Sequence, residues 1–227
     1  MDRRRFVQTL PAMPAALGAC PRLAFAALSE SDAAQGVRAA LERGVSSAVS
    51  LLGRQGGFLD NPKVRIPLPG ALDQAAKMLK MIGQQARVDE LVTAMNRAAE
   101  AAVPEGRAVL ADAVRSMSVE DAQRIVTGGD TSVTDFFARK TREPLTAKFL
   151  PIVTRATERV SLAQKYDAVA GKAAGMGLVK GEDADVRHYV TGKTLDGLYL
   201  MIGEEERRIR SDPVGTGSAI LKKVFGA

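Results

Sequence analysis

Apolar residues recur at intervals of three and four along almost the whole chain, and this spacing constrains the fold more than any other feature. Such intervals place apolar side chains on one face of an α-helix, whereas a half-buried strand requires strict alternation. The chain is rich in Ala, Val and Leu, has no Trp and contains only 4% aromatic residues. Strands favour aromatic and β-branched residues, so this composition favours closely packed helices. The sequence therefore predicts an all-α fold, a single multi-helix bundle.

Three of the apolar stripes are especially regular. The first follows the capping cluster Ser29–Asp32 and ends at Gly53. The second ends before Pro104, which marks the start of the next helix. The third belongs to a long final helix over residues 185–210. In order, the stripes consist of Val37, Leu41, Val45, Ala48, Val49 and Leu52; of Val88, Leu91, Val92, Met95, Ala98, Ala99 and Ala102; and of Leu195, Leu198, Ile202 and Ile209.

One Pro-rich irregular segment, residues 56–70, interrupts this helical pattern. Its apolar residues Val64, Ile66 and Leu68 alternate, as they do in an extended chain. Proline cannot donate a hydrogen bond to a sheet, and Pro67 and Pro69 fall within this stretch. We therefore expect an edge piece or a strap that covers the bundle.

Helix boundaries in the second half of the chain are predicted from caps and breakers. Ser118 is the expected N-cap of a short helix that Gly128–Gly129 ends. Residues 130–140 then form one helix, and a longer helix begins at Thr141. Pro151 lies inside that longer helix and is expected to kink it.

Residues 1–26 have the features of an export signal. Arg3–Arg5 form a basic n-region before a weakly apolar stretch, and Ala24–Ala26 supply a small-x-small cleavage site. Paired arginines followed by Phe6 and Val7 resemble a twin-arginine signal, although an ordinary secretory signal remains an alternative. We predict cleavage after Ala26, delivery to the periplasm and a single helical domain over residues 27–227.

A second cleavage signal overlaps the first. Residues 17–20, ending in Cys20, resemble a bacterial lipobox, in which that cysteine is lipidated and becomes the new N-terminus. Lipidation would anchor the protein to the envelope. The other interpretation is that Cys20, the only cysteine of the chain, is discarded with the signal.

The charge of the mature chain argues against nucleic acid as a partner. Removing the four arginines and one aspartate of residues 1–26 lowers the formal net charge from +6 to +3. A nucleic-acid-binding domain normally carries a much stronger basic surface. No apolar run after the signal approaches the roughly 20 residues that cross a bilayer, so no transmembrane helix is predicted in the mature chain.

Several strings occur in an order that resembles one bacterial family, known only as domain of unknown function 4197. The resemblance implies an exported helical protein with no assigned activity, and it transfers no catalytic residue. The basic triplet of the leader is not something the resemblance requires. The strings are residues 28–41 (LSESDAAQGVRAAL), 57–62 (GFLDNP), 66–69 (IPLP), 96–100 (NRAAE), 128–131 (GGDT), 134–137 (TDFF), 193–206 (KTLDGLYLMIGEEE) and 222–226 (KKVFG).

The first candidate ligand site surrounds the glycine pair at residues 128–129. Backbone N–H groups at a helix start, the hydroxyls of Thr131 and Thr134 and the nearby Arg139 suit an anion. The carboxylates of Asp130 and Asp135 suit a cation instead. A structural role is the alternative: Asp130 or Thr131 caps the helix, and Asp135 pairs with Arg139 four residues later.

Two further polar clusters have both a functional and a structural interpretation. Asn96, Arg97 and Glu100 either line a groove or form a hydrogen-bonded network against a neighbouring helix, with a buried Arg–Glu pair as the favoured form. The acidic run of residues 204–206 is predicted to be a solvated helix face, because Glu204 and Arg208 are spaced for an i,i+4 pair, as are Glu206 and Arg210.

Metal, cofactor and nucleophile chemistry have little support. His188 is the only histidine, and Asp185 alone shares its helix face, which falls short of a zinc ligand set. No phosphate-binding loop, dinucleotide fingerprint or Gly-x-Ser-x-Gly string is present, so no cofactor and no catalytic residue is predicted.

Two classes of function remain. The favoured one is a non-catalytic periplasmic protein that binds a small molecule, an envelope component or another protein through a helical groove. The alternative is an envelope-substrate hydrolase that uses Asp, Glu and Arg side chains. A pocket joining Asp130, Asp135, Arg97 and Glu100 would favour the enzyme.

Overall fold

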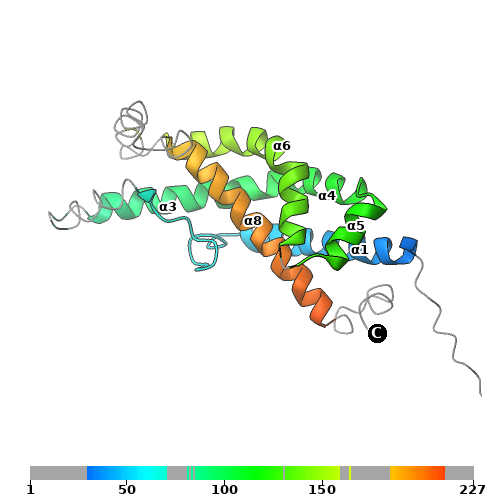
Figure 1. Cartoon of the computed structure of the whole chain (residues 1–227). Helices are drawn as coiled ribbons and strands as arrows, with labels where there is room; N and C mark the ends of the chain where they lie inside the picture. Colours follow the sequence, from blue (N-terminus) through cyan, green and yellow to red (C-terminus); the bar gives the residue numbers. More distant parts are fainter. Residues whose placement is uncertain are drawn as a thin grey trace, which may run out of the picture.

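Helices account for most of the chain that the structure, a computed structural model, describes: residues 30–70, 81, 83, 85–129, 131–158, 164 and 185–212. No strand occurs within these ranges, which confirms the all-α prediction. The elements are α1 (Glu30–Leu52), α3 (Gln85–Ala102), the 3₁₀ turn η1 (Val103–Gly106), α4 (Arg107–Arg115), α5 (Val119–Thr127), α6 (Ser132–Thr157) and α8 (Val186–Ser211) (Figure 1). The predicted leader, with Cys20, and Asp130 lie outside the described residues.

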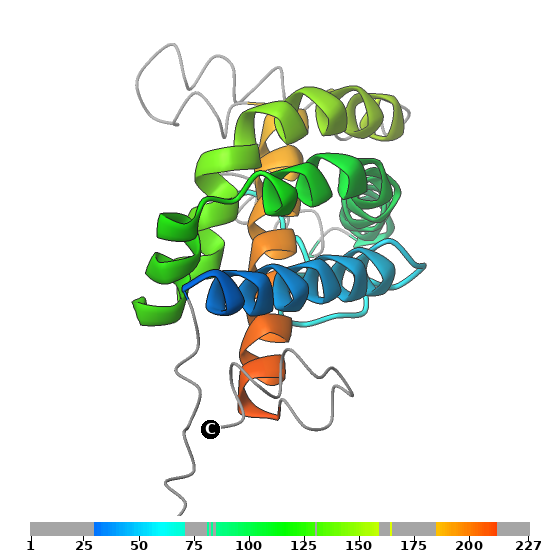
Figure 2. The same cartoon turned by 90° about the vertical axis from the view of Figure 1, so that its right-hand side faces the viewer.

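The bundle is organised around α8, which packs against both α1 and α6. Figure 2 shows α1 and α8 crossing, with α3, α4 and part of α6 to one side of α1. The predicted stripes of α1 and α8 are buried. Full burial of one Leu or Val side chain contributes about 1.5–3 kcal/mol, so these stripes hold the helices together. The described helices include none that is long and apolar enough to span a bilayer.

Three helix boundaries, the end of α1 and both ends of α5, lie where the sequence predicts them. The Gly53 N–H donates to the Val49 carbonyl at 2.9 Å, which closes the last turn of α1. The Asp121 N–H donates to Ser118 Oγ at 3.0 Å, which confirms the predicted N-cap of α5. Gly128 is the C-cap of the same helix. Local capping chemistry therefore fixes these three boundaries.

α6 differs from the prediction, because one continuous helix replaces the two that were expected to meet at Thr141. Thr141 donates its hydroxyl to the Phe137 carbonyl at 2.7 Å, four residues earlier, and is only 1% exposed. It neither caps nor breaks the helix. Pro144 and Pro151 both lie inside α6, which bends visibly in Figures 1 and 2. Proline removes one backbone hydrogen bond and is the usual cause of such a bend.

Residues 53–69, here called the strap, contain neither helix nor strand. The strap runs across the bundle between contacts with α3 and contacts with α8 (cyan in Figure 1). Phe58 and Ile66 are 0% and 1% exposed, and Val64 is also buried. The alternating apolar residues thus cover the core, as expected of a strap.

Candidate functional site

Asn96 on α3 holds the middle of the strap. Its Oδ1 accepts the Ile66 N–H at 2.8 Å, and its Nδ2 donates to the Ile66 carbonyl at 2.9 Å. The same Nδ2 donates to the Val92 carbonyl at 2.8 Å, and the side chain is fully buried. One amide therefore satisfies both backbone groups of Ile66, as a neighbouring strand would.

Glu100, one turn further along α3, holds the start of the strap. Its Oε1 accepts the N–H groups of Phe58 and Leu59, each at 3.1 Å, and its Oε2 accepts from Arg97 Nη1 at 2.6 Å. Burial by itself raises the pKa of Glu100. The hydrogen bond from Arg97 and those from the Leu59 and Phe58 N–H groups more than offset burial, so the pKa lies below its ordinary value.

The predicted Arg97–Glu100 pair therefore exists, with Glu100 only 4% exposed. The residue set packs against the strap rather than against a neighbouring helix, which corrects one part of that interpretation. A helical-wheel argument did not anticipate this, because the strap's partners depend on tertiary packing. Ligand binding by Asn96, Arg97 and Glu100 stays a prediction.

The opposite side of the strap lies against α8. At Gly197 a Cβ atom would stand 3.0 Å from Phe58 Cε1 and 3.2 Å from Val64 Cβ, so glycine permits this close approach. Lys63 Nζ binds Glu204 at 2.8 Å, and the Tyr189 hydroxyl donates to the Pro67 carbonyl at 3.1 Å. The strap is consequently fixed from both sides.

The acidic run of α8 does not form the predicted solvated face. Glu204 pairs with Lys63 of the strap, and Arg208 pairs with Glu205 rather than with Glu204. Glu206 is only 4% exposed. The reason is its position: it follows the buried Ile202 by four residues and precedes the buried Ile209 by three, so it shares their face.

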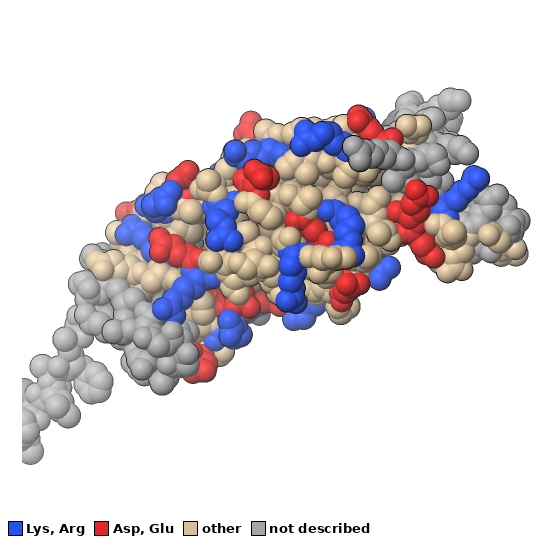
Figure 3. Space-filling model, turned by 180° about the vertical axis from the view of Figure 1, so that it is seen from behind, with Lys and Arg blue, Asp and Glu red and all other residues tan. Residues whose placement is uncertain are grey.

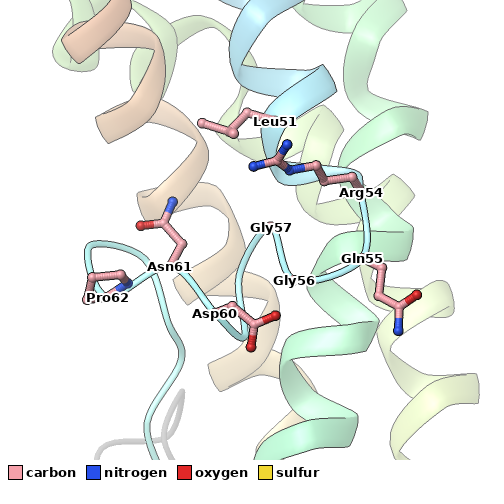
Figure 4. A pocket seen from close by; sticks show the side chains of 8 residues that line it. All are labelled: Leu51, Arg54, Gln55, Gly56, Gly57, Asp60, Asn61 and Pro62. Carbon is pink, nitrogen blue, oxygen red and sulfur yellow. The ribbon is translucent and has the colours of Figure 1, made fainter.

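Two open hollows lined by residues that the structure describes border the strap. The larger, of about 420 Å³, is lined by Leu51, Arg54, Gln55, Gly56, Gly57, Asp60, Asn61 and Pro62 (Figure 4). The smaller, of about 240 Å³, is lined by Lys63, Val64, Arg65, Ile66, Pro67, Lys193, Asp196, Gly197 and Leu200. None of these residues was predicted from the sequence to line a site. Nothing in the spacing of the strap showed which of its side chains would border a cavity.

The cluster near residues 128–135 lies at the junction of α5 and α6. Thr131 occupies the N-cap position, but its side chain makes no capping hydrogen bond. Asp135 and Arg139 are exposed, and among the described residues they do not form the predicted ion pair. Lys140 Nζ instead lies 3.6 Å from Asp121 of α5. Neither hollow includes a residue of this cluster, and ligand binding there stays a prediction.

His188 and Asp185 do share a helix face, at 3.3 Å between Nδ1 and Oδ2. Asp185 is the N-cap of α8, and its Oδ1 accepts the Arg187 N–H at 2.7 Å. Burial raises the pKa of Asp185, but bonds from Arg187 and His188 bring it below its ordinary value. The described part of the chain contains no group of three or more His, Cys, Asp or Glu residues placed to hold a metal ion.

Charge is mixed over the surface. On the face shown in Figure 3, basic and acidic side chains of the described residues are interspersed, with no continuous area of one sign. This distribution fits the small formal net charge of residues 27–227.

Comparison with known proteins places the chain in a family. No curated protein and no solved structure matches it. The family model described as protein of unknown function (DUF4197) covers residues 27–226, which is nearly everything after the predicted leader. The sequence resemblance is thereby confirmed, and the chain belongs to the DUF4197 family.

Proposed function

We propose that this chain is an exported periplasmic protein that binds a partner or a small molecule without catalysing a reaction, and that the strap is its binding face. The observation that carries the proposal is the use of two buried polar side chains, Asn96 and Glu100, to fix a surface segment. That segment borders both hollows.

The physical argument is preorganisation. Ordering a loop when a ligand arrives costs about 0.5–1.5 kcal/mol for each immobilised side chain, which weakens binding. Here Asn96, Glu100 and Lys63 already hold the strap backbone against α3 and α8. A ligand that enters either hollow meets a segment whose shape is set in advance.

The alternative of an envelope hydrolase depends on Asp130, Asp135, Arg97 and Glu100 sharing a pocket. Arg97 and Glu100 bind each other and the strap, and neither described hollow includes Asp135. Asp130 lies outside the described residues. No observation therefore favours the enzyme over the binding protein.

The location is tested by replacing the arginine pairs of the leader with lysine, Arg3→Lys/Arg4→Lys and Arg4→Lys/Arg5→Lys. A twin-arginine signal requires the pair, so the processed protein should disappear from the periplasmic fraction. Mass spectrometry of the mature N-terminus separates cleavage after Ala26 from lipidation of Cys20. Recovery of the unprocessed wild-type chain from the cytosol would contradict export.

Binding is tested by placing a photo-crosslinking residue, p-benzoyl-phenylalanine, at Arg65 on the strap or at the exposed Arg155 of α6 as the matched control. We expect crosslinked envelope species in cells from position 65 and not from position 155. Native mass spectrometry of the periplasmic protein tests for a retained small molecule. Equal crosslinking at the two positions, together with no retained ligand, would refute a binding role for the strap.

A further inference from the structure

The larger hollow lies where the strap leaves α1, and its lining is mostly polar. Only Leu51 and Pro62 contribute apolar side chains, whereas Arg54, Gln55, Asp60 and Asn61 contribute a cation, an anion and two amides. Figure 4 shows Arg54 above and Asp60 below the Gly56–Gly57 turn. The lining of this one hollow thus includes two residues of opposite charge, on either side of the turn.

Both charges are available to a ligand. Arg54 and Asp60 are exposed, and neither side chain forms a hydrogen bond or ion pair with any other residue that the structure describes. They also do not pair with each other. The nearby Arg65 differs, because its guanidinium donates to the Leu59 carbonyl at 3.3 Å.

The backbone that carries the two charges is held in place. Gly56 has a φ of 81°, which glycine adopts without strain, and a Cβ there would lie 2.3 Å from Asp60 Oδ2. The Gly57 N–H donates to the Arg54 carbonyl at 2.9 Å, and the Asp60 N–H donates to the Gly56 carbonyl at 3.2 Å. Directly beyond the turn, Glu100 binds the N–H groups of Phe58 and Leu59.

We propose that this hollow binds a small zwitterion, an amino acid or short peptide, with its carboxylate on Arg54 and its ammonium group on Asp60. Guanidinium and carboxylate match as a bidentate pair, and a carboxylate accepts charge-assisted bonds from an ammonium group. A volume of about 420 Å³ falls in the range of known small-molecule sites. The inference rests on the proposed binding function and names its ligand class.

The test is calorimetric titration of the mature chain, residues 27–227, with probes that differ in the separation of their two charges. These are glycine, 4-aminobutyrate, 6-aminohexanoate and L-alanyl-L-alanine, with hexylamine and hexanoate as probes that carry one charge. At least one zwitterion should bind about tenfold more tightly than either single-charge probe, since each of its ends makes a charge-assisted bond.

Two variants locate the site. Arg54→Gln and Asp60→Asn should each weaken zwitterion binding about tenfold, to the level of a single-charge probe. Arg155→Gln and Asp89→Asn are the matched controls on exposed faces elsewhere and should leave affinity unchanged. All four residues are exposed, so the fold is expected to survive each change.

The inference is overturned if no zwitterion binds, or if binding persists in both Arg54→Gln and Asp60→Asn. Its failure is distinguishable from failure of the proposed function. If crosslinking is specific to position 65 but no zwitterion binds, the proposed ligand class is refuted while the strap remains supported as the binding face. Loss of both results removes both proposals.

Discussion

At the scale of single residues, the buried side chains of α3 act on a segment far away in sequence. Asn96 and Glu100 are separated from their strap partners by 30 and 42 residues, respectively. Each supplies hydrogen bonds that the irregular backbone cannot obtain from a neighbouring strand. A buried backbone group left without a partner costs about 1–3 kcal/mol, so these two side chains contribute substantially to the free energy of unfolding.

Asn96→Leu tests this directly. Leucine keeps much of the volume but leaves the N–H and carbonyl of Ile66 unpaired, so we expect the free energy of unfolding to fall by about 3 kcal/mol. Urea denaturation measures the change. Thr93→Ala, an exposed position one turn earlier in α3, is the control and should change stability by less than about 0.5 kcal/mol. Equal effects at the two positions would show that the strap does not depend on Asn96.

Glu100 makes the stability depend on pH. Its pKa in the folded protein lies below the ordinary value of 4.5, so the ionised form stabilises the fold above that pH. This contribution is lost as the pH falls through the folded-state pKa. The difference in unfolding free energy between wild type and Glu100→Gln should therefore be largest near neutral pH and shrink below 4.5. Denaturation at a series of pH values tests the trend, and a constant difference would contradict it.

At the scale of elements, the positions of the helices could be predicted from the sequence, but the packing of the strap against α3 and α8 could not. The stripes of α1, α3 and α8 follow from local spacing, as do the cap at Ser118 and the end at Gly128. The boundary expected at Thr141 was wrong, because threonine tolerates a helix interior when its hydroxyl bonds back to the preceding turn. The solvated face expected for residues 204–206 was also wrong at Glu206, because that residue is spaced to share the buried face of Ile202 and Ile209.

The close contact between the strap and α8 predicts that two Gly→Ala substitutions in α8 change the stability in opposite directions. Gly192→Ala should stabilise the protein by about 1 kcal/mol, since alanine favours a helix and a Cβ there meets nothing within 4 Å. Gly197→Ala adds the same preference but pushes a Cβ against the fully buried Phe58. We expect a net loss of about 1–2 kcal/mol from that overpacking. Thermal denaturation compares the two variants. Stabilisation by both would show that Phe58 shifts at little cost to make room for the Cβ atom.

The candidate site shows the same limit. Asn96, Arg97 and Glu100 could be selected as a polar cluster on a strongly amphipathic helix, but the sequence placed them on its polar side, whereas Asn96 and Glu100 are buried. Arg54 and Asp60 were not, since a charged residue in a Gly- and Pro-containing loop is usual at any surface. The relative positions of Arg54 and Asp60 depend on the turn at Gly56 and on the hydrogen bonds that Glu100 accepts from the two residues after Gly57.

At the scale of the whole molecule, we expect residues 27–227 to unfold in one cooperative step. Buried residues of the strap, α3 and α8 pack into one large apolar cluster. The same cluster includes residues from all of the described helices. Without Trp, the tertiary probe is tyrosine, and Tyr199 is fully buried against Thr141. Near-ultraviolet dichroism and far-ultraviolet dichroism should give the same midpoint. Two separate midpoints would indicate two folding units.

The bond between Asn96 and Ile66 also has a kinetic consequence. Amide protons in irregular segments usually exchange with deuterium quickly, because they form hydrogen bonds only with water. The Ile66 amide is held by a fully buried side chain, so it should exchange as slowly as the amides of α3. A stretch without regular secondary structure would then open only when the helices beneath it open.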